Sequence, residues 1–200
     1  INCGEKRRNM NNFKGSRGKN MFVGVVVLYN PDTDTVIKNI NSYARQLDKL
    51  LIVDNSDHYN HKMESLDKNE NIQYVFFGEN KGIAYALNKG IDFAKQEKAK
   101  WLLTMDQDSN FVEKEFGDFL NFMKNDTVEY CDGVIFSPLH KVPYLVQEKG
   151  IVKVNSVMTS GNFINIDLVD EIGYFNEDLF IDSVDHDFCF RINAKGYSIY

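Results

Sequence analysis

Two aspartates separated by one residue form the clearest candidate for chemistry in this sequence. Asp106 and Asp108 follow Trp101-Leu-Leu-Thr-Met105, an apolar run with the composition of a buried strand. A carboxylate pair at a strand end suits a hard divalent cation that keeps several waters and shares substrate phosphates. Such a cation would neutralise charge on a departing diphosphate. The structural alternative is that Asp108 or Ser109 caps the helix that follows.

A second acidic group lies near the end of the chain, in Phe180-Ile-Asp-Ser-Val-Asp-His-Asp-Phe-Cys-Phe-Arg191. If this segment is helical, Asp185 shares a face with Phe188 and points toward the body of the protein. Asp187 then lies four residues before Arg191 and pairs with it at the surface. The structural alternative for Asp185 is a favourable position near the positive end of the helix dipole.

Two further polar segments could contact a nucleotide. Asp54 follows the apolar run Leu50-Leu-Ile-Val53 and could accept hydrogen bonds from a base or a ribose, or close an Asx-turn. Gly78-Glu-Asn-Lys-Gly82 opens a helix, and its backbone amides and Lys81 could face phosphate, unless it is a plain loop. It matches neither the P-loop nor the dinucleotide-binding fingerprint.

The elements that must position these residues alternate along the first part of the chain. Apolar runs predict strands at 22–29, 50–53, 72–77 and 101–105, and helical spacing predicts helices over 36–47, 83–94 and 112–123, with a short helix within 57–70. This order predicts an α/β fold with a mostly parallel central sheet flanked by helices. Ligands bind outside the carboxyl ends of such strands, so Tyr29-Asn30, Asp54 and Asp106 should face one crevice.

The pattern changes after residue 126 and predicts a smaller mixed region. Short strands are expected at 134–136, 152–154 and 157–164, helices at 167–172 and 183–195, and the start of a strand at 197–200. We therefore expect one domain over 21–200, in a chain that continues beyond residue 200.

Charge is unevenly distributed over the 200 residues. The net charge is −6, but residues 1–20 carry +5 and should form a disordered basic leader, with contact to anionic lipid as the alternative. The remaining −11 argues against nucleic acid as a partner. The longest apolar run, 22–29, is too short to span a bilayer. Widely spaced cysteines without a C-x-x-C pair favour a reducing, cytoplasmic setting.

Six segments, in this order along the chain, resemble those of family-2 inverting glycosyltransferases of the GT-A (Rossmann-like) fold. They are Val25–Pro31, Leu51–Ser56, Asn80–Gly90, Asp106–Ser109, Thr159–Gly161 and Asp185–Arg191. The resemblance covers residues 22–200. The DQDS motif, the GIAYALN helix and the GYFNEDLFIDSVDHDFCFR ending look most like bacterial rhamnosyltransferases, which use dTDP-L-rhamnose to build O-antigen or capsule glycans.

The resemblance implies a role for each matching residue. It divides the domain into a nucleotide-binding half, 21–110, and an acceptor-side half, 111–200. It implies that Asp106 and Asp108 hold Mg²⁺ or Mn²⁺ under the diphosphate, and that Asp185 is the catalytic base. The other implied contacts are Tyr29 and Asn30 beside the nucleotide, Asp54 on the pyrimidine, Asn80, Lys81, Gly82 and Asp106 along the donor, and Gly161 on the acceptor side.

Two departures from the family pattern concern this site. Many relatives have a Glu-Asp pair at the base, whereas Ser183-Val184 precede Asp185 here. Many relatives also supply a metal-binding histidine downstream of the base helix, beyond the last residue of this chain. The metal site of this sequence alone is therefore expected to be incomplete.

The resemblance implies a dTDP- or UDP-sugar donor and a glycan or lipid-linked acceptor; a lipid-linked acceptor would place the protein at the inner face of the plasma membrane. One alternative is transfer of galactofuranose or an N-acetylhexosamine from UDP. A sugar nucleotidyltransferase would carry a Gly-rich loop with Arg and Lys after the first strand, where this sequence has Tyr29-Asn-Pro-Asp32. The remaining alternative is a non-catalytic nucleotide-binding module.

Overall fold

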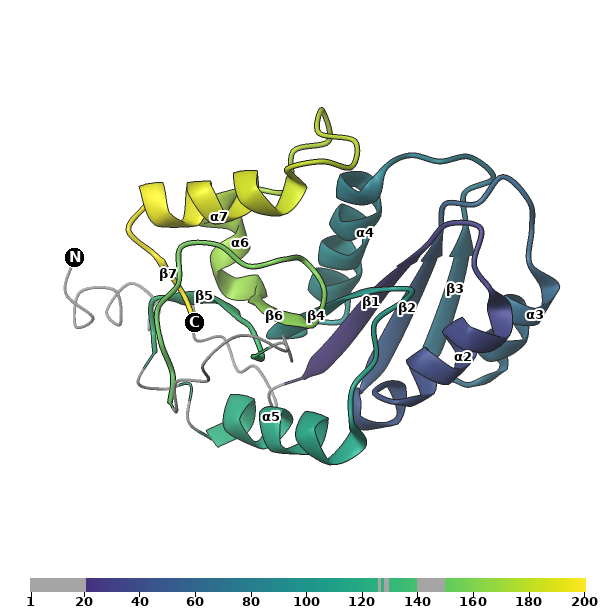
Figure 1. The fold of residues 1–200 in the computed structure, drawn as a ribbon, viewed down its shortest axis with the longest axis horizontal. Helices are drawn as coiled ribbons and strands as arrows, with labels where there is room; N and C mark the ends of the chain where they lie inside the picture. The colour runs from purple at the N-terminus through teal and green to yellow at the C-terminus, as the bar shows by residue number, and fades with distance from the viewer. Residues whose placement is uncertain (1–20, 126, 128–129, 140–149) are drawn as a thin grey trace, which may run out of the picture.

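A computed structural model describes residues 21–125, 127, 130–139 and 150–200 (Figure 1). The predicted basic leader, 1–20, lies outside the described residues. Within the described ranges, seven strands form one sheet in the order β3-β2-β1-β4-β6-β5-β7. Their bounds are β1 Phe22–Leu28, β2 Lys49–Asp54, β3 Ile72–Phe76, β4 Trp101–Asp106, β5 Gly133–Phe136, β6 Asn162–Asn165 and β7 Ser198–Ile199.

The pairing confirms a mostly parallel sheet with a mixed edge. β1 lies parallel to both β2 and β4, and β3 extends the parallel part beyond β2. β6 is antiparallel to its neighbours β4 and β5, and β7 is parallel to β5. The carboxyl ends of the parallel strands therefore lie along the same side of the sheet, and the polar residues that follow these strands in the sequence lie there too.

Helices cover both faces of the sheet (Figure 1). Their bounds are α2 Thr33–Asn41, α3 His61–Glu64, α4 Ile83–Gln96, α5 Glu113–Asn125, α6 Ile166–Ile172 and α7 Val184–Ala194, with 3₁₀ turns η1 Ala44–Gln46 and η2 Ser65–Lys68. β1 is buried along its whole length because Val23 and Val25 face the core under α4, while Phe22 and Val26 face the core under α2 and α5. This double burial explains the continuous apolar run in its sequence.

Three predicted elements differ from the structure. The helix expected over 36–47 ends at Asn41 and is followed by η1, yet Tyr43 and Leu47 stay buried in the same core. The strand expected over 157–164 begins only at Asn162, because Gly161 has a φ of +85° and turns the chain. The predicted strand at 152–154 is reduced to a single bridge between Val154 and Ile199.

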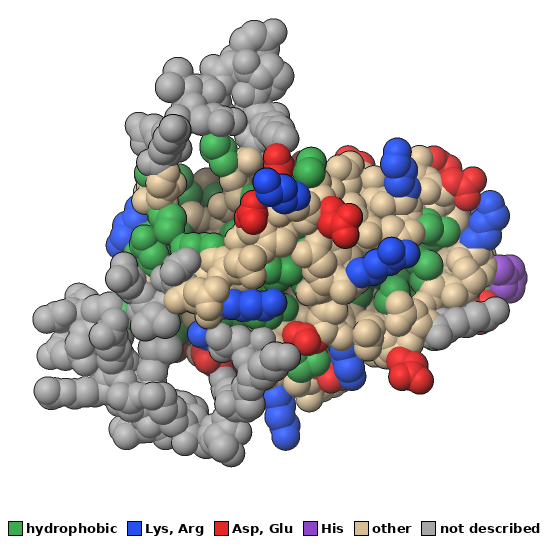
Figure 2. Space-filling model, turned by 90° about the horizontal axis from the view of Figure 1, so that it is seen from below, with side chains coloured by type: hydrophobic (Ala, Val, Ile, Leu, Met, Phe, Trp, Pro, Cys, Tyr) green, Lys and Arg blue, Asp and Glu red, His purple; other side chains and the backbone are tan. Residues whose placement is uncertain are grey.

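The surface seen from below carries mixed charge. Lys and Arg side chains lie among Asp and Glu side chains over this face (Figure 2). Across the described part of the chain, no helix combines the length and the apolar character that a membrane span requires.

Candidate active site

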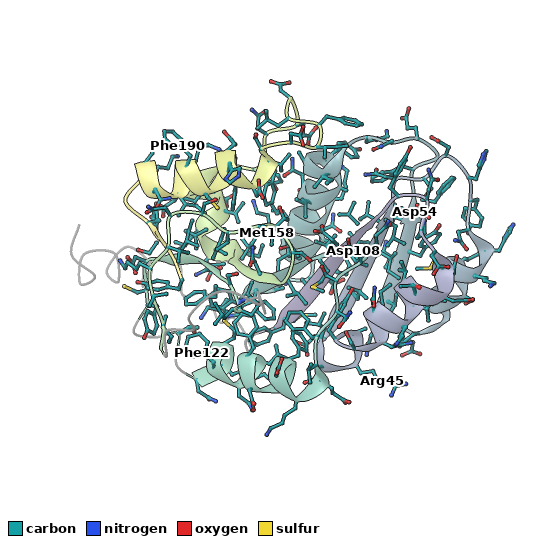
Figure 3. The ribbon with its side chains drawn as sticks, in the orientation of Figure 1. Arg45, Asp54, Asp108, Phe122, Met158 and Phe190 are labelled. Carbon is teal, nitrogen blue, oxygen red and sulfur yellow. The ribbon has the colours of Figure 1, made fainter. Side chains whose placement is uncertain are left out.

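The sheet register brings three of the predicted segments to one edge. Leu28 at the end of β1 is opposite Asp54 on β2, and Val27 is opposite Asp106 on β4. β2, which ends at Asp54, and β4, which leads to Asp108, flank β1 in the sheet, and both aspartates are labelled in Figure 3. The polar residues that follow these strands therefore converge as the sequence predicts.

Gln107, between the two aspartates, fixes their loop to the end of β1. Its Oε1 accepts a hydrogen bond from Tyr29 N at 2.9 Å, and its Nε2 donates to Tyr29 O at 3.2 Å. Asn39 Nδ2 donates to the Gln107 carbonyl at 2.9 Å. The exposed Tyr29 and the following Asn30, which has a φ of +45°, are thus held beside the two aspartates.

Asp54 is completely buried and already has hydrogen-bond partners. Ser56 N donates to its Oδ1 at 2.9 Å, which closes the Asx-turn, and Tyr74 OH donates to its Oδ2 at 2.6 Å. Burial and this bond to Asp54 raise the pKa of Tyr74. Since an ionised carboxylate offers about four acceptor positions, Asp54 keeps capacity for a further donor.

The Asn80-Lys81-Gly82 turn packs against the loop that leads to α7. Gly82 N donates to Asn80 Oδ1 at 3.0 Å, and Ile83 N donates to Phe180 O at 2.8 Å. Gly82 has a φ of +84°, and a Cβ there would lie 2.6 Å from Phe180 O, so a side chain does not fit. These two amides are occupied by protein acceptors, whereas the Lys81 side chain is exposed and pairs with Glu79 at 3.1 Å.

An open hollow of about 410 Å³ lies beside the ends of β1 and β2. Asn30 and Ser56 join its two sides, because Asn30 N donates to Ser56 Oγ at 2.7 Å. The lining residues are Asn30, Pro31, Ser56, His58, Tyr59, Asn60, His61 and Lys62. The hollow gives a ligand room next to the strand ends that carry the predicted nucleotide contacts.

The charges of Asp108 and Asp185 act on Asp106. Asp106 is partly buried, and its pKa is raised to about 6 by burial, then by the charge of Asp108, then by that of Asp185. α5 begins at Glu113, so Asp108 and Ser109 do not cap it, and the helix-cap alternative is wrong. The fold therefore gathers uncompensated negative charge at the end of β4.

Asp185 lies in the first turn of α7 with the orientation that the sequence predicts. Phe188 and Cys189 are buried on its side of the helix, and Asp185 itself is half-buried. Asp187 Oδ2 instead accepts a hydrogen bond from Arg191 Nε at 2.9 Å and lies 2.8 Å from Arg191 Nη2 in an ion pair. This pair is partly buried, whereas the sequence predicts it at the surface, and Asp185 is separate from it.

The Thr159–Gly161 segment contacts β4 and borders a cavity that Asp185 also lines. Asp106 N donates to Ser160 Oγ at 3.0 Å, and Gly161 N donates to Thr104 O at 2.7 Å. Thr159 and Asp185 line the same small cavity of about 10 Å³, which has room for about one water molecule. Gly161 therefore lies next to β4, and its place on the acceptor side stays a prediction.

Residues 25–179 match the sequence profile described as "Glycosyl transferase family 2". The chain belongs to glycosyltransferase family 2. This membership agrees with the five of the six segments that lie within residues 25–179, whereas Asp185–Arg191 lies beyond the matched range. The seven-strand sheet flanked by helices is the GT-A architecture.

Individual relatives agree with this assignment. The dTDP-rhamnosyl transferase RfbF of Shigella flexneri is 28% identical over an alignment of 197 positions, and the alignment covers 88% of this chain and 64% of the relative. The solved structure of S. aureus TarS 1–349 superposes with a TM-score of 0.64 at 17% identity, over 90% of this chain and 58% of TarS 1–349. TarS 1–349 in complex with UDP-GlcNAc gives a TM-score of 0.63 at 16% identity, over 90% and 56% of the two chains.

Asp106 and Asp108 fit a cation that shares its ligands with a bound phosphate group. Across the described ranges, no three His, Cys, Asp or Glu side chains are arranged to hold a metal ion. Asp106 and Asp108 provide two carboxylates, so water and a diphosphate would have to complete the coordination. A cation here would also relieve the repulsion that raises the pKa of Asp106.

We expect the uncompensated charge of Asp106 to lower the stability of the metal-free protein. Because the folded-state pKa of about 6 exceeds the ordinary value of 3.8, wild-type stability falls as pH rises through this window. Asp106→Asn should be nearly neutral near pH 4 and stabilising by at most about 2–3 kcal/mol at pH 8. Thermal unfolding in a chelator, with the exposed Asp118→Asn as control, measures this difference. An equal effect of Asp106→Asn at both pH values would contradict it.

Three side-chain amides at the site or on its supporting elements are not indicated by the sequence pattern. Gln107 lies between the two aspartates, and Asn88 is a polar residue on the apolar helix α4. Asn55 follows Asp54, and its Nδ2 donates to Gly82 O at 3.1 Å. An amide side chain at a buried or strand-end position needs hydrogen-bond partners, and this need is the signal in the sequence that could have identified these residues.

Proposed function

We propose that this family-2 glycosyltransferase transfers L-rhamnose from dTDP-L-rhamnose to a glycan or lipid-linked acceptor, with inversion, in the synthesis of a cell-surface polysaccharide such as O-antigen. The observation that carries the proposal is the 28% identity to a dTDP-rhamnosyl transferase over 88% of the chain. The chain spans 64% of that relative's length, so the identity concerns the shared part only.

The proposed donor site is built on the strand ends of the parallel sheet. Tyr29 and Asn30 lie beside the nucleotide, and Asp54 receives the pyrimidine. Asn80, Lys81 and Gly82 bound the donor site, with the Lys81 ammonium available to phosphate. Asp106 and Asp108 hold Mg²⁺ or Mn²⁺. When bound, this ion stabilises the negative charge of the leaving diphosphate.

The proposed reaction is a single displacement. Asp185 removes the proton from the acceptor hydroxyl as its oxygen attacks the anomeric carbon, and the bond to the diphosphate breaks on the opposite face. One such displacement inverts the anomeric configuration and needs no enzyme nucleophile. Gly161 belongs to the segment that borders the acceptor. A lipid-linked acceptor would place the reaction at the cytoplasmic face of the plasma membrane.

Donor preference provides the test of this function. We expect dTDP-L-rhamnose, with Mn²⁺, to bind more tightly than UDP-galactofuranose or UDP-N-acetylglucosamine in calorimetry, and to be consumed when acceptor is present. NMR of the product should show the anomeric configuration opposite to that of the donor. Preferred binding of a UDP-sugar would contradict dTDP-L-rhamnose as the donor and favour transfer from UDP. Binding without transfer to any acceptor would favour a non-catalytic nucleotide-binding module. Release of pyrophosphate from a nucleoside triphosphate would instead indicate a nucleotidyltransferase.

A further inference from the structure

Asn88 is a buried polar link between α4 and the loop that leads into α7. It is 5% exposed. Its Nδ2 donates to Phe175 O at 3.0 Å and to Glu177 Oε1 at 2.7 Å, and its Oδ1 accepts from Phe175 N at 2.9 Å. Every hydrogen-bonding group of this amide is therefore directed at the loop.

The chemistry of the partners fixes the orientation of the Asn88 amide. A backbone N–H can only donate and a carbonyl oxygen can only accept, so Asn88 Oδ1 must face Phe175 N and Nδ2 must face Phe175 O. An aspartate at this position would keep the shape but turn an oxygen toward Phe175 O and the Glu177 carboxylate. Asn88→Asp is thus a shape-conserving change that replaces two attractive contacts with repulsive ones.

α4 holds the segment 170–180 at several points along its length. Ile83 N donates to Phe180 O at 2.8 Å, Tyr174 OH donates to Asp92 Oδ1 at 2.9 Å, and Lys95 pairs with Asp170. The Tyr174 and Lys95 contacts are partly or largely open to solvent, whereas both backbone bonds of Asn88 are buried. Since buried hydrogen bonds are the costly ones to lose, Asn88 should contribute most to the fixed position of this loop.

The position of Phe175 is passed on to α7 by ring packing. The Phe175 and Phe188 rings stack with centroids 4.3 Å apart and planes 27° apart. Phe188 is 1% exposed and lies three residues after Asp185, on the same side of the helix. The position of Phe175 therefore constrains the position and the rotation of the first turn of α7, which carries Asp185.

We propose that Asn88 is a positioning residue for the Asp185 carboxylate, acting through Phe175 and Phe188. The inference rests on the proposed function, because it takes Asp185 as the base. A reacting group displaced by about 1 Å can cost roughly 10²-fold in rate. Asn88→Asp should therefore lower kcat by about 10- to 100-fold, with the KM for the donor and the affinity for its nucleotide nearly unchanged.

The experiment is a double-mutant cycle on kcat with Asn88→Asp and Asp185→Asn in the full-length protein. If Asn88 acts through Asp185, adding Asn88→Asp to Asp185→Asn should lower kcat by less than about twofold further. Leu120→Ala removes a buried side chain of α5, on the other face of the sheet, and controls for lost stability. Asn88→Ser, which adds no charge, replaces Asn88→Asp if that variant does not fold.

Three outcomes are distinguishable. A large loss in the Asn88 variant that disappears in the Asp185→Asn background supports the inference. An unchanged kcat in the Asn88 variant, a loss that multiplies with that of Asp185→Asn, or an equal loss in Leu120→Ala would overturn it while Asp185 remains the base. Wild-type transfer by Asp185→Asn would overturn the base assignment and this inference with it.

Discussion

Replacing Asp185 with asparagine should lower the rate of sugar transfer by roughly 10²- to 10⁴-fold, the usual contribution of a general base. Asparagine keeps the size of the side chain but cannot accept the proton of the acceptor hydroxyl. Donor affinity should stay close to wild type, because a base contacts the acceptor and not the nucleotide. Steady-state kinetics and nucleotide calorimetry on the same preparation separate these two quantities.

Asp187→Asn is the matched control for this experiment. It lies two residues away on the same helix, but its carboxylate is paired with Arg191 and does not face Asp106. The pair is partly buried, so its loss should lower stability by roughly 1–2 kcal/mol while leaving transfer nearly unchanged. If the two variants exchanged these behaviours, the base would lie on the other face of α7. Transfer at the wild-type rate by Asp185→Asn would eliminate a general base at this position.

Divalent cation should tighten binding of a nucleoside diphosphate by roughly 10- to 100-fold, about 1.4–2.8 kcal/mol. The physical reason is the negative charge around Asp106, whose pKa is raised by burial and then by the charges of Asp108 and Asp185, and this charge opposes a further anion. A cation offsets this charge and takes the diphosphate oxygens as further ligands. Calorimetry with dTDP in Mn²⁺ and in chelator measures the difference.

Asp108→Ala tests whether the Asp108 carboxylate is responsible for the effect of Mn²⁺ on dTDP affinity. The side chain is exposed and caps no helix, so its removal should cost little stability. The variant should lose most of the Mn²⁺ effect, while Asp118→Ala, an exposed aspartate on α5 with the same change in charge, should keep it. Equal affinity for dTDP with and without Mn²⁺ in the wild type would exclude a metal between these residues and the diphosphate.

Local patterns in the sequence determined the parallel part of the sheet and the crevice at its edge. The apolar run of β1 predicts a strand buried on both faces, and the three polar strand ends follow from where each run stops. The i, i+4 spacing of Asp187 and Arg191 separates that pair from Asp185 on α7. These features depend on neighbours within about one helical turn or one strand, and so they are readable from spacing.

Tertiary structure alone decided how these parts are held in register. Tyr29 and Gln107 are 78 positions apart, and Asn88 and Phe175 are 87 positions apart, yet each pair forms complementary amide hydrogen bonds. The cap alternative for Asp108 was also excluded only by the position at which α5 begins. A side-chain amide meets distant backbone groups only after the sheet and α4 have formed, and periodicity along the chain carries no record of that contact. The positions of Asp54, Asp106 and Asp108 at strand ends could be predicted from the sequence because these residues follow local apolar runs. The amides that orient these segments could not, because their partners are set by packing across the fold.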